Sequence, residues 1–258
     1  AMSRSQTGPG SVTFDYSGAS VLVTGGTSGI GAATAAAYRD AGAAVTITGT
    51  RGGPGEYDAD LSDFRYKQLD VTDPEQLSRV AEKTDRLDIL VHSGGVGLAS
   101  LGLDEYEPDN FELAIRMHLT SVYRFSHLCL DKLSASHLPG GASVIGIASM
   151  ASYFGIEVVP GYGAAKAGLV QLMKTLAVAW SSRNIRANAV AAGMTRTRQT
   201  AAVTENPEYG APFLENTPMK RFGEPGEIAD AVLFLTSSAA SYITGQTINV
   251  CGGYSISG

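Results

Sequence analysis

The stretch Ser20-Val21-Leu22-Val23-Thr24 leads directly into Gly25-Gly26-Thr27-Ser28-Gly29-Ile30-Gly31, and this junction decides the fold. The first five residues are an apolar run without alternation, which is typical of a β-strand covered on both faces. The segment Ile30–Ala41 follows a helical pattern, so the glycines lie in a turn between a strand and a helix. The free N–H groups at the start of such a helix attract phosphate groups. The junction therefore predicts a dinucleotide-binding βα unit. The alternative is a glycine-rich turn that connects the strand to the helix without binding a cofactor.

Three glycines of this turn have separate expected roles. Gly25 lets the chain reverse, Gly29 lets the backbone approach a diphosphate, and Gly31 lets the helix pack close to the strand. We expect the other cofactor contacts of the turn to come from Thr27, Ser28 and Ile30.

The same alternation of apolar strand and helical pattern continues along the chain. Alternating strands and helices indicate an α/β protein with a doubly wound parallel sheet and helices on both faces. The seven expected strands are Ser20–Thr24, Ala44–Thr48, Phe64–Leu69, Asp88–His92, Ala142–Ala148, Arg186–Ala191 and Thr247–Val250. The expected helices are Ile30–Ala41, Pro74–Lys83, Asn110–Ser136, Tyr162–Ser182 and Pro225–Leu235.

We expect one catalytic domain over residues 17–258. Residues 1–16 are polar and are expected to be a disordered extension, with Ala1 before Met2 as a cloning remnant. The polar, proline-containing segment 195–218 follows the sixth strand, at the sheet end where such folds bind ligands. This segment is therefore a candidate lid.

Composition excludes several classes of protein. The 258 residues are 44% hydrophobic and 17% charged, which suits one large core, and the formal net charge of -6 disfavours nucleic acid or an anionic membrane as partner. Two cysteines cannot build a disulfide framework, and the four histidines lack the spacing of a helical metal site. Because of the histidine and cysteine spacing, we expect no bound metal. No apolar run matches a membrane span or a signal peptide, so we expect a cytoplasmic protein.

Ser149, Tyr162 and Lys166 carry the chemistry. Tyr162 and Lys166 are four residues apart on one helix face, so the ammonium is expected to lower the pKa of the phenol. A tyrosine tuned in this way acts as a general acid or base. Ser149 closes a strand, where its hydroxyl can bond a substrate oxygen. A solvated tyrosine–lysine pair is the simpler alternative.

The spacing Thr-Gly-x-x-x-Gly-x-Gly from Thr24 to Gly31, together with this trio, resembles the short-chain dehydrogenase/reductase family, classical type. The resemblance runs from about Gly18 to Gly253. It implies a Rossmann-like fold in which Tyr162 is the general acid/base, Lys166 lowers its pKa and holds the nicotinamide ribose, and Ser149 orients the substrate. It also implies cofactor contacts from Asp70, Val71, Ser93, Gly94, Gly95, Gly193, Thr195 and Thr197.

The chain departs from the family pattern at two histidines. His92 opens His92-Ser93-Gly94-Gly95 where Asn-Asn-Ala-Gly is usual, and we interpret it as a buried strand-end histidine with one satisfied ring nitrogen. His118 replaces the family's catalytic asparagine. An imidazole can keep the proton relay and add pH sensitivity, or it can be turned out of the site, and both interpretations stay open.

The cofactor expectation depends on the end of the second strand. Gly49-Thr50-Arg51 follows it with no acidic residue, and an arginine there favours the 2′-phosphate of NADP(H) over the 2′-hydroxyl of NAD(H). Thr50 and Arg51 are therefore candidate cofactor residues. NAD(H) remains possible, because a solvated loop arginine is the alternative.

The expected substrate is an apolar or aromatic ketone or secondary alcohol. Residues that flank the catalytic groups are mostly apolar, although each can equally be core filler: Val96, Tyr153, Phe154, Val159 and Met194. The resemblance also implies a homotetramer in which the helices Asn110–Ser136 and Tyr162–Ser182 pair. The alternative function is a catalytically impaired sensor or scaffold, and a hydrolase is disfavoured because Gly-x-Ser-x-Gly is absent.

Overall fold

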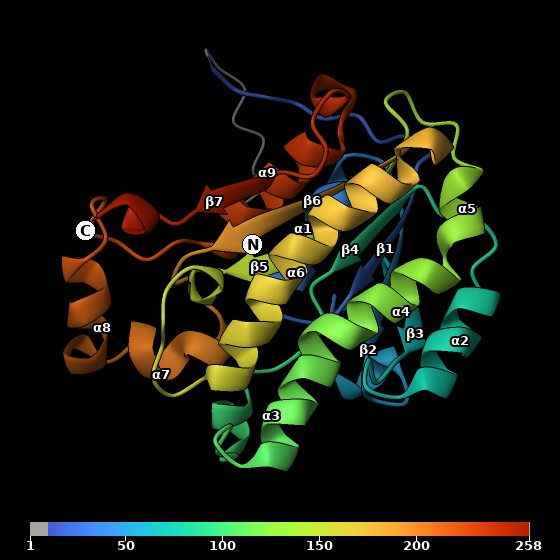
Figure 1. Ribbon diagram of the computed structural model, residues 1–258. Helices are drawn as coiled ribbons and strands as arrows, with labels where there is room; N and C mark the ends of the chain where they lie inside the picture. The colour runs from blue at the N-terminus through green and yellow to red at the C-terminus, as the bar shows by residue number, and fades with distance from the viewer. Residues whose placement is uncertain (1–9, 258) are drawn as a thin grey trace.

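The computed structural model describes residues 10–257 and contains one seven-stranded parallel sheet (Figure 1). The strand order is β3-β2-β1-β4-β5-β6-β7. The strands are β1 (Ser20–Thr24), β2 (Ala44–Gly49), β3 (Arg65–Gln68), β4 (Ile89–His92), β5 (Ala142–Ser149), β6 (Ile185–Ala192) and β7 (Thr247–Val250). This confirms the predicted doubly wound fold, because the order reverses between β1 and β4.

Helices cover both faces of the sheet. On one face α1 (Gly29–Asp40) packs against α9 (Pro225–Thr236). On the other face lie α2 (Pro74–Glu82), α4 (Ser121–Leu128) and α6 (Pro160–Trp180), in front of the sheet in Figure 1. Each face has its own apolar core, so β1, β4 and β5 are buried on both sides, as their unbroken apolar runs predict.

The register brings the carboxyl ends of the central strands to one edge of the sheet. Thr24 pairs with His92, and Ser149 pairs with Ala192. The loops that follow these residues therefore meet at this edge, where a doubly wound sheet binds ligands.

The helix predicted over Asn110–Ser136 is interrupted in the structure. It consists of α3 (Pro108–Ile115), a π-helical turn (Arg116–Thr120), α4, and α5 (Leu130–Ser134) beyond a break at Cys129. In the π-helical turn the N–H of Ser121 donates to the carbonyl of Arg116, five residues back, which inserts one extra residue into the helix. A hydropathy pattern does not show such an insertion.

Two further segments bear on the expected domain layout, the N-terminal region and the candidate lid. The packed domain begins before residue 17, because Tyr16 is buried and its hydroxyl donates to the Leu233 carbonyl at 2.6 Å. The first part of the expected extension, residues 1–9, lies outside the described residues. The expected lid segment 195–218 contains two short helices, α7 (Ala201–Thr204) and α8 (Pro207–Glu215).

Candidate active site

Ser149 stands at the carboxyl end of β5. It is the N-cap of a 3₁₀ turn (Met150–Ser152), and its hydroxyl oxygen accepts the N–H of Ala151 at 3.2 Å. Because the oxygen accepts from the backbone, its hydrogen is free to point into the site. The Ser149 side chain lies close enough to Tyr162, in the first turn of α6, to lower the pKa of its phenol.

Tyr162 and Lys166 are one helical turn apart at the end of the sheet, where Lys166 is buried and Tyr162 is half-buried. The Nζ atom of Lys166 lies 5.4 Å from the centroid of the Tyr162 ring. It donates a hydrogen bond of 2.6 Å to the carbonyl of Ile147 on β5. The structure thus brings together the three side chains that the sequence selects, on β5 and α6.

The pKa of the Tyr162 phenol is raised from its ordinary value, which differs from the expected lowering by Lys166. Burial of the phenol is the main cause, and the negative charge of Glu105 adds to it, while the Ser149 hydrogen bond opposes both. Burial also lowers the pKa of Lys166 to about 8. Desolvation, which sequence spacing cannot reveal, therefore sets the direction in which the pKa of Tyr162 shifts.

Glu105 is a site residue that sequence reasoning missed. Its side chain is 1% exposed, and its Oε2 atom accepts the backbone N–H of Tyr162 at 2.7 Å. In sequence it belongs to Asp104-Glu105-Tyr106-Glu107, which has the composition of a solvated acidic loop. Only the fold brings this carboxylate to a helix 57 residues further along the chain.

His118 lies on the π-helical turn against Tyr162 instead of being rotated out of the site. Its Nε2 atom donates to the carbonyl of Val96 at 3.2 Å, since a carbonyl can only accept. Its Nδ1 atom is buried and has no hydrogen-bond partner within residues 10–257. Burial, together with the charge of Lys166, lowers the pKa of His118 to about 3. A pKa this low leaves the histidine neutral at physiological pH, which disfavours the pH-sensitive relay that the sequence left open.

His92 is a buried packing residue, as we interpreted it. Its Nε2 atom shares a 2.8 Å hydrogen bond with the Ser126 hydroxyl, and its ring meets Phe125 edge to face. Burial lowers the pKa of His92 to about 3.

The glycine turn after β1 has the shape that a dinucleotide requires. A Cβ added to Gly25 would lie 2.7 Å from the Cα of Gly94, and one added to Gly31 would overlap the carbonyl oxygen of Gly25. Gly29, at φ +55°, begins α1, and the N-cap Ser28 makes no side-chain capping bond within the described residues. The first-turn N–H groups are thus left for an anionic ligand, so these residues fit a dinucleotide diphosphate.

Further predicted cofactor residues surround this turn. The Thr24 hydroxyl accepts the N–H groups of Ser93 at 3.2 Å and of Gly94 at 3.0 Å, which holds the β4 loop beside the turn. Gly94 in turn contacts Val71, since an added Cβ would lie 3.2 Å from that side chain. Asp70, by contrast, uses its carboxylate locally, accepting the N–H and the hydroxyl of Thr72.

The loop after β2 presents Arg51. Its guanidinium lies 4.8 Å from the ring centroid of Tyr57, and its backbone N–H donates to the Tyr57 hydroxyl at 3.0 Å. The Tyr66 hydroxyl donates to the Arg51 carbonyl, and the Thr50 carbonyl accepts from Gln68. The guanidinium is exposed at the end of β2 with its backbone fixed on both sides.

The candidate lid contacts both neighbouring loops. The Thr197 Cγ2 atom would be 3.4 Å from a Cβ added to Gly29, and Gln199 donates from Nε2 to the Gly95 carbonyl at 3.1 Å. Thr195 is buried and donates its hydroxyl to the carbonyl of Gly193. Thr197 therefore lies beside the glycine turn, whereas the Thr195 hydroxyl is used within its own loop.

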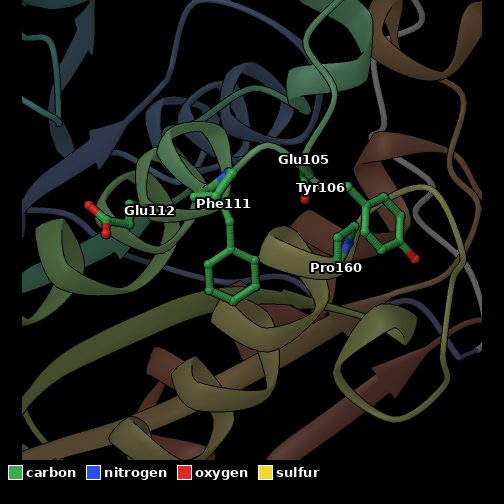
Figure 2. A pocket seen from close by; sticks show the side chains of 6 residues that line it. Glu105, Tyr106, Phe111, Glu112 and Pro160 are labelled. Atoms are coloured by element: carbon green, nitrogen blue, oxygen red, sulfur yellow. The ribbon is translucent and has the colours of Figure 1, made fainter.

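The candidate substrate residues differ in exposure. Tyr153 and Phe154 are 46% and 38% exposed on the β5–α6 loop, and Phe154 meets Tyr254 edge to face. Val96, Val159 and Met194 are half-buried. The cavity in Figure 2, about 420 Å³, lies behind the start of α6 and includes none of these five residues. A second cavity, of about 320 Å³, is lined by Met194 together with Cys251.

Within residues 10–257, no group of three or more histidine, cysteine, aspartate or glutamate side chains is placed to hold a metal ion. None of the helices in this part of the chain has the length and apolar character needed to cross a membrane.

Comparison with known proteins gives matches over nearly the whole chain. A family model described as enoyl-(acyl carrier protein) reductase matches residues 25–255. The chain is 36% identical to a tropinone reductase homolog, At2g29340, of Arabidopsis thaliana, over 95% of this chain and 82% of the relative. It is 34% identical to a 3alpha-hydroxysteroid dehydrogenase of Mediterraneibacter gnavus, over 90% and 95%. The solved Pseudomonas aeruginosa RhlG/NADP active-site complex has a TM-score of 0.83 at 30% identity, covering 94% of this chain and 98% of that one.

Proposed function

The chain belongs to the short-chain dehydrogenase/reductase family of oxidoreductases, and on this premise we propose that it transfers a hydride between NADP(H) and a ketone or secondary alcohol, with Tyr162 as general acid/base. The observation that carries the proposal is the position of Tyr162, beside the Ser149 side chain and with the Nζ atom of Lys166 5.4 Å from its ring centroid. Geometry of this kind allows proton transfer at a substrate oxygen held by the same serine.

The proton step follows from these side chains. When bound, NADP(H) supplies or accepts the hydride at the carbonyl carbon. In ketone reduction the O–H bond of Tyr162 breaks and its proton goes to the carbonyl oxygen, while the Ser149 hydroxyl donates a hydrogen bond to that oxygen. In alcohol oxidation the phenolate takes the alcohol proton back. The raised pKa of Tyr162 keeps the phenol protonated at neutral pH, which favours its role as the acid in reduction.

Arg51 supports NADP(H) over NAD(H). Its guanidinium is always charged and can bond the 2′-phosphate at two oxygens. Stacking on Tyr57 restricts the guanidinium before any ligand arrives, so less entropy is lost on binding. The RhlG complex, a structural neighbour of this chain, contains NADP.

We propose an apolar or aromatic carbonyl substrate. Exposed aromatic side chains at Tyr153 and Phe154 lie four and five residues after Ser149 and leave apolar area for a ligand to cover. A steroid dehydrogenase and a tropinone reductase homolog among the relatives agree with bulky cyclic substrates.

The test is a panel of cyclic, aromatic and short-chain ketones with NADPH and with NADH, followed by the absorbance of the reduced nicotinamide. The proposal expects turnover with bulky apolar ketones and NADPH. Binding of NADPH without turnover of any ketone or alcohol would favour the non-catalytic sensor, against which the retention of Ser149, Tyr162 and Lys166 argues.

We also propose a homotetramer through α4 and α6. Both helices carry apolar side chains that the single chain leaves exposed, Tyr123 at 50% and Val178 at 82%. Pairing of these faces would bury them. Light scattering of the parent and of Val178→Asp, expected to dissociate, tests the assembly.

A further inference from the structure

Glu105 is buried against the backbone of Tyr162, and no described residue forms an ion pair with it. It lies in the loop before α3, and its side chain is 1% exposed. Its Oε1 atom has no hydrogen-bond partner within residues 10–257. A carboxylate in such surroundings costs free energy and is rarely found without a role.

The first turn of α6 lacks a cap of its own. Its N-cap, Val159, has no side-chain acceptor, so the N–H of Tyr162 would be unsatisfied without Glu105. The Glu105 Oε2 atom accepts that N–H at 2.7 Å. A negative charge at this end of a helix also interacts favourably with the helix dipole. Glu105 therefore caps the turn that carries Tyr162 from a separate part of the chain.

The loop and α3 hold Glu105 in this position. The Asp104 carboxylate accepts the N–H of Tyr106 at 2.9 Å, and Asn110 donates to the Asp104 carbonyl at 2.8 Å. α3 touches α6 closely, because a Cβ added to Gly161 would lie 2.9 Å from the Cβ of Ala114. Figure 2 shows Tyr106 and Phe111 beside Glu105 in the cavity next to Pro160. The close packing of α3 on α6 at Gly161 leaves the first turn of α6 little room to shift.

The titratable groups around Tyr162 come from three elements. Lys166 lies on the same helix, and the neutral His118 lies on the π-helical turn. Glu105 is the negative group among those three, and its charge raises the pKa of Tyr162.

Resting on the function proposed above, we propose that Glu105 is a positioning residue for proton transfer: its carboxylate fixes the first turn of α6 on Ser149, and its charge keeps the Tyr162 phenol in the proton-donating form. Glu105 touches the backbone of Tyr162 and not the reacting atoms, so it acts through the tyrosine. The inference adds Glu105 to the expected residues Ser149, Tyr162, Lys166 and His118.

Three variants separate the charge from the hydrogen bond. Glu105→Gln keeps an acceptor oxygen but removes the charge, Glu105→Asp keeps the charge on a shorter arm, and Glu105→Ala removes both. Glu112→Gln is the matched control, because Glu112 lines the same cavity but is exposed on α3. Each variant is assayed for ketone reduction as a function of pH, and its tyrosinate absorbance is titrated without substrate against the same variant carrying Tyr162→Phe.

The proposal expects the high-pH limb of kcat, where the acid form of Tyr162 is lost, to move to lower pH by about half a unit or more in Glu105→Gln and Glu105→Ala. Glu105→Asp should keep the parental limb with a several-fold lower kcat, since its shorter arm holds the turn less well. A purely structural role would lower kcat and thermal stability without moving the limb or the titration.

Superimposable limbs and tyrosinate titrations for the parent and Glu105→Gln would overturn the proposal, as would an equal shift in Glu112→Gln. If Glu105→Gln does not fold, a shift of the limb in Glu105→Asp overturns it instead, because that variant keeps the charge. Failure of the proposed function is distinguishable: Tyr162→Phe would then turn over like the parent, while the substrate-free titration still reports the coupling of Glu105 to Tyr162.

Discussion

The imidazole of His118 meets the phenol ring of Tyr162 edge to face, with the ring centroids 4.9 Å apart and the planes at 85°. The π-helical turn directs His118 inward, and Gly95 leaves the space, since an added Cβ would lie 2.7 Å from Nδ1. Because Nε2 donates to Val96, Nδ1 is a hydrogen-bond acceptor without a partner among the described residues. An acceptor fixed beside Tyr162 and Lys166 suits a proton relay that does not require the histidine to be charged.

His118→Asn should therefore leave the shape of the pH–rate profile unchanged between about pH 5 and pH 8. The parental pKa of about 3 already lies below this range. The free energy of unfolding of the parent should fall as the pH drops from about 6.5 towards 3, because His118 binds a proton in the unfolded chain but not when it is buried. The variant lacks this histidine, so its free energy of unfolding should fall less. Urea unfolding at several pH values measures the difference. A kinetic ionisation near pH 6.5 that disappears in the variant would contradict the neutral relay.

Tyr162→Phe should reduce turnover by about 10²- to 10⁴-fold, because the ring keeps its packing but has no proton to exchange. The affinity for NADPH, measured by fluorescence, should change little. Tyr242→Phe is the control, since that tyrosine is fully exposed and far from any role in the proposed reaction. Parental ketone reduction by Tyr162→Phe would refute the acid/base assignment.

Lys166→Met should stabilise the fold at neutral pH while reducing activity. Burial lowers the pKa of Lys166 from 10.5 to about 8, so the folded chain is penalised for holding the ammonium below pH 8. At 1.36 kcal/mol per unit the penalty is at most about 3 kcal/mol, and it disappears as the pH rises from 8 towards 10.5. Over that window the parent should gain stability relative to Lys166→Met in urea unfolding. Lys174→Met, at an exposed position of α6, is the control, and its stability should change with pH as that of the parent does. The same pH dependence of stability in the parent and both variants would contradict the prediction.

Arg51→Ala should weaken NADPH binding by roughly 10- to 100-fold and leave NADH within about twofold, since only the 2′-phosphate loses its charged partner. Arg65→Ala, on the edge strand β3, controls for general loss of positive charge. Equal weakening of both cofactors would mean that Arg51 supports the loop and does not select the phosphate.

The strands and the approach of Ser149, Tyr162 and Lys166 to one another were predictable because both depend on local patterns that the fold preserves. The apolar runs of β1 and β5 are buried on both faces, and the observed strands agree with prediction to within a few residues. Parallel strands bring their carboxyl ends together, so Ser149 at the end of β5 was expected beside the start of α6. In the same way, the small residues after β4 were expected beside the glycine turn.

The rest depended on information that a local pattern does not contain. The π-helical turn changes the helix by a single residue, which leaves the periodicity around His118 almost unaltered. Glu105 is indistinguishable from its acidic neighbours until the loop is folded against α6. The raised pKa of Tyr162 follows from burial in three dimensions, whereas the spacing to Lys166 suggests the opposite sign.

Gln199→Ala should loosen the candidate lid. The Gln199 amide is the donor that links segment 195–218 to the Gly95 carbonyl, and Gly95 also packs against His118. Losing one exposed hydrogen bond costs about 1 kcal/mol, so the KM for the cofactor should rise several-fold. Where lid opening limits product release, kcat should rise as well. Hydrogen exchange over 195–218 should become faster in the variant, with Gln246→Ala as an exposed-glutamine control. Unchanged exchange and KM would show that the segment is held by Thr197 beside Gly29 and not by this amide.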